Sequence, residues 1–285
     1  MLDLLQHDFV QNAFLAGTLV AILSALVGYF IVLRGQSFAS EALSHIGFAG
    51  ATGAALLGLS PLVGMLAFTC LAAIGMGALG KRLRGREIEV GMLLSFMLGL
   101  GVLFLSLYTR YASEAVGVLF GSLLSVTRPD VLITLAGGLV TIGLLIFLYR
   151  PLLFASIDPE MAEARGVPVQ TLSVFFLLLM ALSVSMAIQV VGVLLVFALL
   201  VVPAAAAERL THRPVAALVA GVLISLLCTW GGLILAFLGR WPVSFYIVGL
   251  TSLVYFASLA VHAVRFPGRY REPPHPGREL LPPAR

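Results

Sequence analysis

The chain of 285 residues is more apolar and less charged than a water-soluble protein. Hydrophobic residues make up 60% of it, charged residues make up 11%, and the mean hydropathy is +1.09. Soluble globular domains carry about 25% charged residues, so this composition excludes a soluble globular protein and indicates a chain that lies in lipid. The formal net charge of +4 is the balance expected from basic loops at a membrane surface, and no nucleic-acid partner is expected.

Apolar stretches of membrane-crossing length follow one another along most of the chain. A hydrocarbon core about 30 Å thick requires roughly 20 apolar residues per helix. The alternation of period two that marks outer-membrane barrels is missing. The sequence therefore predicts an all-α fold, a polytopic membrane helical bundle of about eight transmembrane helices plus short or discontinuous helices. The predicted spans are residues 9–33, 40–58, 61–79, 88–109, 131–149, 172–188, 214–238 and 243–264.

Two further apolar segments do not fit this pattern. Residues 188–208 contain Gln189, Gly192 and Pro203, which predicts a short or discontinuous helix. Irregular backbone at membrane depth is tolerated where it packs in protein or lines a cavity, so we expect this segment, with Gln189, to line a pathway. Residues 116–126 are apolar but too short to cross. These segments leave the number of helices open by one. The side of the membrane on which the N-terminus lies is open for the same reason.

Basic residues gather in a few of the predicted loops, which the positive-inside rule places in the cytoplasm. The N-terminus lacks the basic region of a cleaved signal peptide, so the first span is expected to remain. The proline- and arginine-rich residues 267–285 predict a disordered cytoplasmic tail, and residues 1–266 a membrane domain. The predicted location is the cell (inner) membrane, with many passes. The basic residues are Lys81, Arg82, Arg84, Arg86, Arg209, Arg213, Arg265, Arg269, Arg271 and Arg278.

Glu41 and His45 are the most informative polar residues, because they lie one helical turn apart within a predicted span. A charged side chain near the bilayer centre costs about 3 kcal/mol, so an ionisable pair there indicates a function. Residues i and i+4 share a helix face, and carboxylate and imidazole groups bind Zn²⁺ or Mn²⁺. Two copies of the chain about a twofold axis would supply two of each. The alternative is a hydrogen-bonded pair that fixes helix packing.

A polar interruption near residues 158–166 carries the start and stop signals of a short helix. Asp158 can cap a helix whose first residue is Pro159, and Gly166 with Pro168 can end it. A plain loop has no need of these signals. The segment predicts a short cytoplasmic helix of the kind that a transporter presents to an ATPase, with an ordinary loop helix as the alternative.

Four stretches, in this order, resemble the permease subunits of ABC importers for divalent metals, the zinc and manganese uptake family. The resemblance covers nearly the whole chain before the tail. In that family the second span commonly carries Asp followed four residues later by His, and both line the metal pathway. Here Glu41 occupies the Asp position, which keeps the charge and adds one methylene, and His45 matches. The four stretches are residues 34–45, 119–126, 158–167 and 191–206.

The resemblance implies a permease that pairs as a dimer, binds cytoplasmic ATPase subunits and receives metal from an extracytoplasmic binding protein. Such a chain is not itself an enzyme and holds no permanent cofactor, since zinc or manganese is its cargo. Alternating access at the dimer interface is implied. A secondary transporter or cation channel, in which Glu41 and His45 relay protons, is the alternative and would need no ATPase. The residues expected to couple to the ATPase are Asp158, Pro159, Glu160, Glu163, Arg165 and Gly166.

Overall fold

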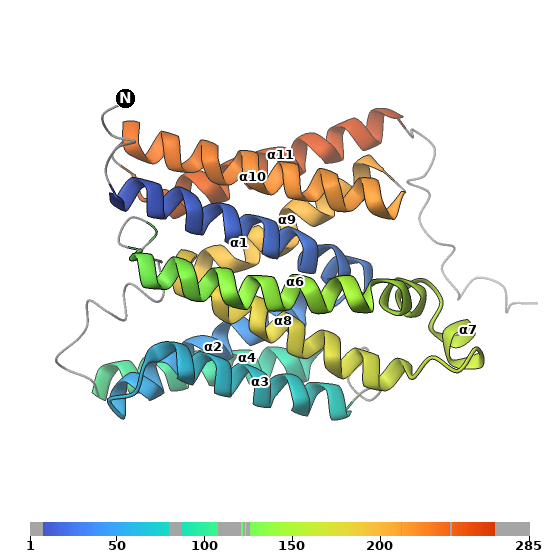
Figure 1. Cartoon of the computed structure of the whole chain (residues 1–285), viewed down its shortest axis with the longest axis horizontal. Coiled ribbons are helices and arrows are strands. Elements are labelled where there is room, and N and C mark those ends of the chain that lie inside the picture. Colours follow the sequence, from blue (N-terminus) through green and yellow to red (C-terminus); the bar gives the residue numbers. More distant parts are fainter. Residues whose placement is uncertain are drawn as a thin grey trace, which may run out of the picture.

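The computed structural model describes residues 8–79, 87–107, 121, 123, 126–211, 213–239 and 241–265. The basic loop at residues 81–86, most of residues 116–126 and the tail at residues 267–285 lie outside the described residues. Within the described part the chain forms helices and no strand, and the long helices run alongside one another in one bundle (Figure 1).

The helices coincide with the apolar stretches of the chain. They end where glycine, proline or polar residues gather. Among the eight helices that are apolar enough to cross a membrane, α8 is the most enclosed and α4 the least: 72% of the apolar stretch of α8 is buried, compared with 6% in α4. The core of the bundle therefore lies along α8 and its neighbours. The helices are α1 (Asp8–Leu33), α2 (Ser37–Leu56), α3 (Pro61–Leu79), α4 (Glu87–Leu107), α6 (Arg128–Ile157), α7 (Pro159–Ala164), α8 (Val169–Val191), α9 (Val193–Leu210), α10 (Pro214–Leu238) and α11 (Val243–Arg265).

Eight of the described helices are long and apolar enough to cross a membrane, which confirms the polytopic all-α bundle. Seven of them coincide with predicted spans, and the eighth is α9. The discontinuity expected within residues 188–208 is present, because Gly192 separates α8 from α9, but α9 is a full span and not a short helix. The interruption is confined to Gly192, whose φ of 81° suits glycine, and α9 then continues through Pro203. Neighbouring helices enclose α9, which lets the helix tolerate the missing proline donor.

The remaining predicted span, residues 40–58, forms α2, which has the length of a span but a lower hydropathy than the other helices. The structure explains this difference, because every residue from Ala42 to Thr52 is buried in protein. A Cβ atom on Gly50 would lie 2.4 Å from the carbonyl oxygen of Gly64 on α3. Small residues thus let α3 approach to backbone contact, and the polar helix is shielded from lipid by its neighbours.

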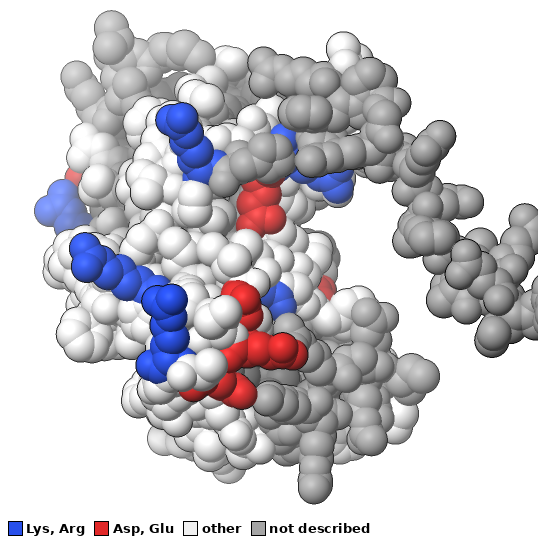
Figure 2. Space-filling model, turned by 90° about the vertical axis from the view of Figure 1, so that its right-hand side faces the viewer, with Lys and Arg blue, Asp and Glu red and all other residues white. Residues whose placement is uncertain are grey.

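One end of the bundle carries α7 and the basic residues of the described loops. α6 extends beyond its predicted end at residue 149 and contains Pro151, and its last turns point in a different direction from the rest of the helix (Figure 1). Figure 2 looks onto this end and shows basic and acidic side chains gathered there. The positive-inside rule assigns this end to the cytoplasm, and the opposite end, where α1 begins, to the extracytoplasmic side.

Candidate metal site

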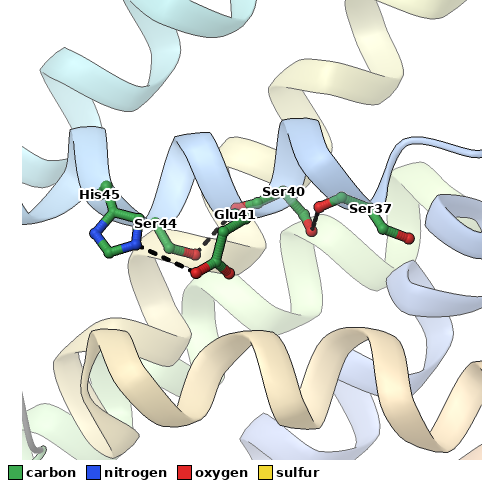
Figure 3. A network of polar contacts seen from close by, with 5 residues as sticks. All are labelled: Ser37, Ser40, Glu41, Ser44 and His45. Atoms are coloured by element: carbon green, nitrogen blue, oxygen red, sulfur yellow. Dashed lines mark hydrogen bonds and ion pairs between the residues drawn. The ribbon is translucent and has the colours of Figure 1, made fainter. Parts of the chain in front are cut away.

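Glu41 and His45 meet on α2, as their spacing predicts. The Nε2 atom of His45 lies 3.2 Å from the Oε1 atom of Glu41. Their side chains are 11% and 33% exposed, respectively, and both leave the same side of the helix (Figure 3). The imidazole is therefore enclosed in protein, whereas the Glu41 side chain is partly exposed although its Oε2 atom is buried.

The remaining ligand atoms of this pair are buried and unpartnered. Neither the Oε2 atom of Glu41 nor the Nδ1 atom of His45 has a hydrogen-bond partner among the described residues, although buried polar atoms nearly always find one. When Nε2 carries the proton and donates it to Glu41, Nδ1 presents a lone pair. The pair thus offers two Lewis bases with no proton donor facing them, which is the chemistry that binds a cation.

The serine hydroxyls beside the pair are oriented by their own helix. Ser40 donates to the carbonyl oxygen of Ser37 at 2.7 Å, and Ser44 donates to that of Ser40 at 3.0 Å (Figure 3). Since both hydroxyl protons point to backbone carbonyl oxygens of α2, neither hydroxyl donates to Glu41. The carboxylate therefore stays available to an incoming charge.

The described residues of one copy supply only part of a coordination shell. The described residues contain no group of three or more His, Cys, Asp or Glu side chains placed to hold a metal ion. A Zn²⁺ ion takes four ligands, and protein sites for it use at least three side chains. Glu41 and His45 of one copy therefore do not fill such a site by themselves.

The second predicted feature, α7, has the cap and the ends that its sequence indicates. The Oδ1 atom of Asp158 accepts a hydrogen bond from the backbone N–H of Met161 at 2.9 Å, and Pro159 is the first helical residue. At the other end Gly166 has a φ of 81°. Its N–H donates to the carbonyl oxygen of Glu163, and the N–H of Val167 donates to the carbonyl oxygen of Ala162, both at 3.0 Å. This pair of hydrogen bonds is a Schellman motif.

The surface of α7 is open to solvent on most of its circumference. Ala162 is its only buried residue, while Glu160, Met161 and Glu163 are exposed. Arg165 lies over the ring of Phe154 in α6, with its guanidinium carbon 5.9 Å from the ring centre. A short, capped and exposed helix of this kind can present a defined surface to a partner.

Gln189 lies near the opposite end of the bundle, close to the break at Gly192. Its Nε2 atom donates to the Oδ1 atom of Asp130 on α6 at 3.1 Å, while its Oε1 atom is buried and meets no hydrogen-bond partner within the described ranges. Asp130 also accepts from the N–H of Thr127 at 3.0 Å. Sequence reasoning missed Asp130 because it lies 59 residues away, with no spacing signal to join it to Gln189.

Comparisons with known proteins agree with the architecture of the bundle. The chain matches the ABC 3 transport family over residues 6–262. It is 34% identical over 212 residues to the manganese transport system membrane protein MntC of Halalkalibacterium halodurans, covering 74% of this chain and 73% of that protein. It is 27% identical over 230 residues to the high-affinity zinc uptake system membrane protein ZnuB of Haemophilus influenzae, covering 80% and 88% of the two chains.

A solved structure shares the arrangement of the helices. PsaBC from Streptococcus pneumoniae in complex with Fab superposes with a TM-score of 0.81 and 26% identity, covering 90% of this chain and 94% of that chain. The match thus extends over most of the chain. The chain therefore belongs to the ABC 3 transport family and is a multi-pass integral protein of the inner membrane.

Proposed function

We propose that this chain is the permease subunit of an ATP-driven importer of divalent metal ions, manganese or zinc. The names of its relatives, which are manganese and zinc transport proteins, support this function. The observation that carries it is the Glu41 and His45 pair, whose buried atoms Oε2 and Nδ1 have no hydrogen-bond partner in the part of the chain that the structure describes. Such a pair within a membrane bundle is suited to a cation that passes through it.

The metal pathway lies between two copies of the chain, with Glu41 and His45 of each copy facing it. Two carboxylates and two imidazoles would complete a four-ligand set, and the carboxylates would neutralise the divalent charge. The metal is cargo, so the site must release it when the pathway closes to one side of the membrane and opens to the other. Gln189 lines the same pathway nearer the extracytoplasmic end.

The two ends of the bundle receive different partners. Cytoplasmic ATPase subunits dock on α7 and its flanking residues, Asp158, Pro159, Glu160, Glu163, Arg165 and Gly166. An extracytoplasmic metal-binding protein delivers the ion at the opposite end. ATP hydrolysis takes place in the separate subunits, so the permease itself is not an enzyme and holds no resident cofactor.

The test is metal uptake by the permease reconstituted with its ATPase in lipid vesicles. Glu41→Gln and His45→Ala are each expected to abolish uptake of radioactive manganese and zinc, because each removes one ligand per copy and leaves an unpaired group in a dry site. The complex should still assemble and retain basal ATP hydrolysis. Thr52→Ala is the matched control on α2, since that hydroxyl bonds only the carbonyl oxygens of Phe48 and Ala49, and it should transport normally.

Two outcomes would contradict the proposal. Normal uptake by both the Glu41 and the His45 variants would remove these residues from the pathway. Uptake that follows an ion gradient, needs no ATP and occurs in a permease that binds no ATPase would favour a secondary transporter or a channel.

A further inference from the structure

Arg34 ends α1 at the cytoplasmic side of the bundle and is joined to α2 by a rigid turn. Gly35 has a φ of 63°; its N–H donates to the carbonyl oxygen of Val32 at 2.9 Å, and the N–H of Gln36 donates to that of Ile31 at 2.8 Å. This is a second Schellman motif, and α2 begins one residue later. Because the turn is fixed by two hydrogen bonds, a displacement of Arg34 displaces the start of α2, one turn before Glu41.

The guanidinium of Arg34 reaches both segments that flank α7. Its Nη2 atom lies 2.6 Å from the hydroxyl oxygen of Ser173 on α8, and its Nη1 atom lies 3.4 Å from that of Ser156 on α6. Ser156 precedes Asp158, the cap of α7, by two residues, and Ser173 lies in the second turn of α8. One side chain thus contacts both the segment that precedes α7 and the segment that follows it.

The two serines are arranged to receive a donor and not to give one. The hydroxyl of Ser156 donates its proton to the carbonyl oxygen of Leu152 at 2.5 Å, and that of Ser173 donates to Val169 at 2.9 Å. Each oxygen can therefore only accept from Arg34. A planar guanidinium spans two acceptors on different helices, whereas a lysine ammonium acts as a single point charge.

An aromatic contact fixes the plane of this guanidinium. Its central carbon lies 5.4 Å from the centre of the Phe176 ring on α8, a cation–π distance. Phe176 is fully buried and packs edge-on against Phe30 of α1, with 6.2 Å between the ring centres. The contact ties α1 to α8 beneath α7 and keeps Arg34 within reach of both serines.

We propose that Arg34 is a positioning residue that transmits the position of α7 to the metal-binding helix α2. When ATPase subunits move α7, the flanking ends of α6 and α8 carry Ser156 and Ser173, Arg34 follows them, and the rigid turn shifts Glu41. This inference rests on the proposed function, in which α7 contacts the ATPase and α2 binds the metal. It assigns the connection between the two to one side chain.

The test measures Mn²⁺ affinity of the full complex twice, without nucleotide and with a non-hydrolysable ATP analogue. The ratio of the two affinities is the coupling factor, which for allosteric proteins is typically about 5- to 150-fold. Arg34→Ala is expected to bring this ratio close to 1. The double variant Ser156→Ala with Ser173→Ala should do the same, because it removes both acceptors and leaves the arginine, while Arg34→Lys should give an intermediate ratio.

Arg150→Ala is the matched control, since Arg150 is an exposed arginine of α6 near the same end, and it should leave the ratio unchanged. A wild-type ratio retained by Arg34→Ala would overturn the inference. So would an equal loss of affinity in both nucleotide states, which would mean that Arg34 only shapes α2. If Arg34→Ala does not fold, the double serine variant decides by the same criteria.

The wild-type complex separates this inference from the proposed function. A wild-type permease that binds neither Mn²⁺ nor an ATPase would contradict the proposed function itself. A wild type that binds both, but with a coupling factor of 1, would overturn the role of Arg34 alone.

Discussion

At the scale of single residues, His45 can use its two ring nitrogens for different tasks. Nε2 contacts the carboxylate of Glu41, and Nδ1 is buried without a partner. A carboxylate that accepts a hydrogen bond from the N–H of one ring nitrogen fixes the tautomer and raises the basicity of the other nitrogen, which is a common arrangement behind metal-binding histidines. Glu41 thus has two ways to serve a cation, as a ligand itself or by orienting the imidazole.

Glycine at residue 28 is required by the packing of α1 on α9. A Cβ atom at Gly28 would lie 1.7 Å from the carbonyl oxygen of Leu200, and a backbone atom cannot move aside as a flexible side chain can. Gly28→Ala is therefore expected to lower the free energy of unfolding by about 1 to 3 kcal/mol or more. Thermal unfolding of the purified permease in detergent would measure this loss.

Gly138→Ala is the control for that prediction. Gly138 is also a buried helical glycine, but an added Cβ atom would meet no atom within 4 Å. The free energy of unfolding of the Gly138→Ala variant should stay the same or rise slightly, because alanine is more favourable than glycine in a helix by about 1 kcal/mol. Equal effects of the two substitutions would show that close packing at Gly28 does not matter.

At the scale of elements, α7 can act as a lever because both of its ends are fixed. Asp158→Ala removes a cap worth about 1 kcal/mol, and Gly166→Val places a β-branched residue at a φ of 81°. The double variant should still bind metal at Glu41 and His45. Metal should no longer stimulate ATP hydrolysis, however, and uptake should stop, because a frayed helix absorbs the movement that a rigid one transmits.

Stimulated ATP hydrolysis and cross-linking together check this prediction. Gln170→Ala, at an exposed position on α8 shortly after Gly166, is the control and should behave like the wild type. A cross-linker on Glu163→Cys should capture an ATPase subunit. If the double variant transports at the normal rate, or the cross-linker captures no ATPase, α7 is not the coupling element.

The elements were predictable from sequence where their signals are local. Long apolar runs gave most spans, and Asp158, Pro159 and Gly166 gave the ends of α7, because capping depends on neighbours in the chain. α9 was misjudged, since Pro203 indicates a break when neighbouring helices are unknown. The Gln189 contact with Asp130 and the Arg34 contacts with serines join residues far apart in the chain, so only the packed bundle reveals them.

At the scale of the whole molecule, the bundle keeps its polar functions apart. The basic and acidic groups around α7 lie at one end, and the Asp130 and Gln189 contact lies near the other. Between them α2 holds its ionisable pair inside a shell of α3, α4, α8 and α9. Lipid faces the apolar outer side chains, such as Phe147, which is 82% exposed. This arrangement lets a cation meet protein and not hydrocarbon on its way across.

The incomplete ligand set of one chain leads to a prediction about stoichiometry. If the site forms between two copies, the purified permease should bind one Mn²⁺ ion per two chains, measured by equilibrium dialysis with metal analysis. Mixed dimers of one wild-type and one His45→Ala chain, isolated with two affinity tags, should lose tight binding, because three side-chain ligands remain instead of four. A wild-type dimer carrying the same two tags is the control. One ion per chain, or full affinity in the mixed dimer, would mean that each copy binds metal by itself, with water supplying the missing ligands.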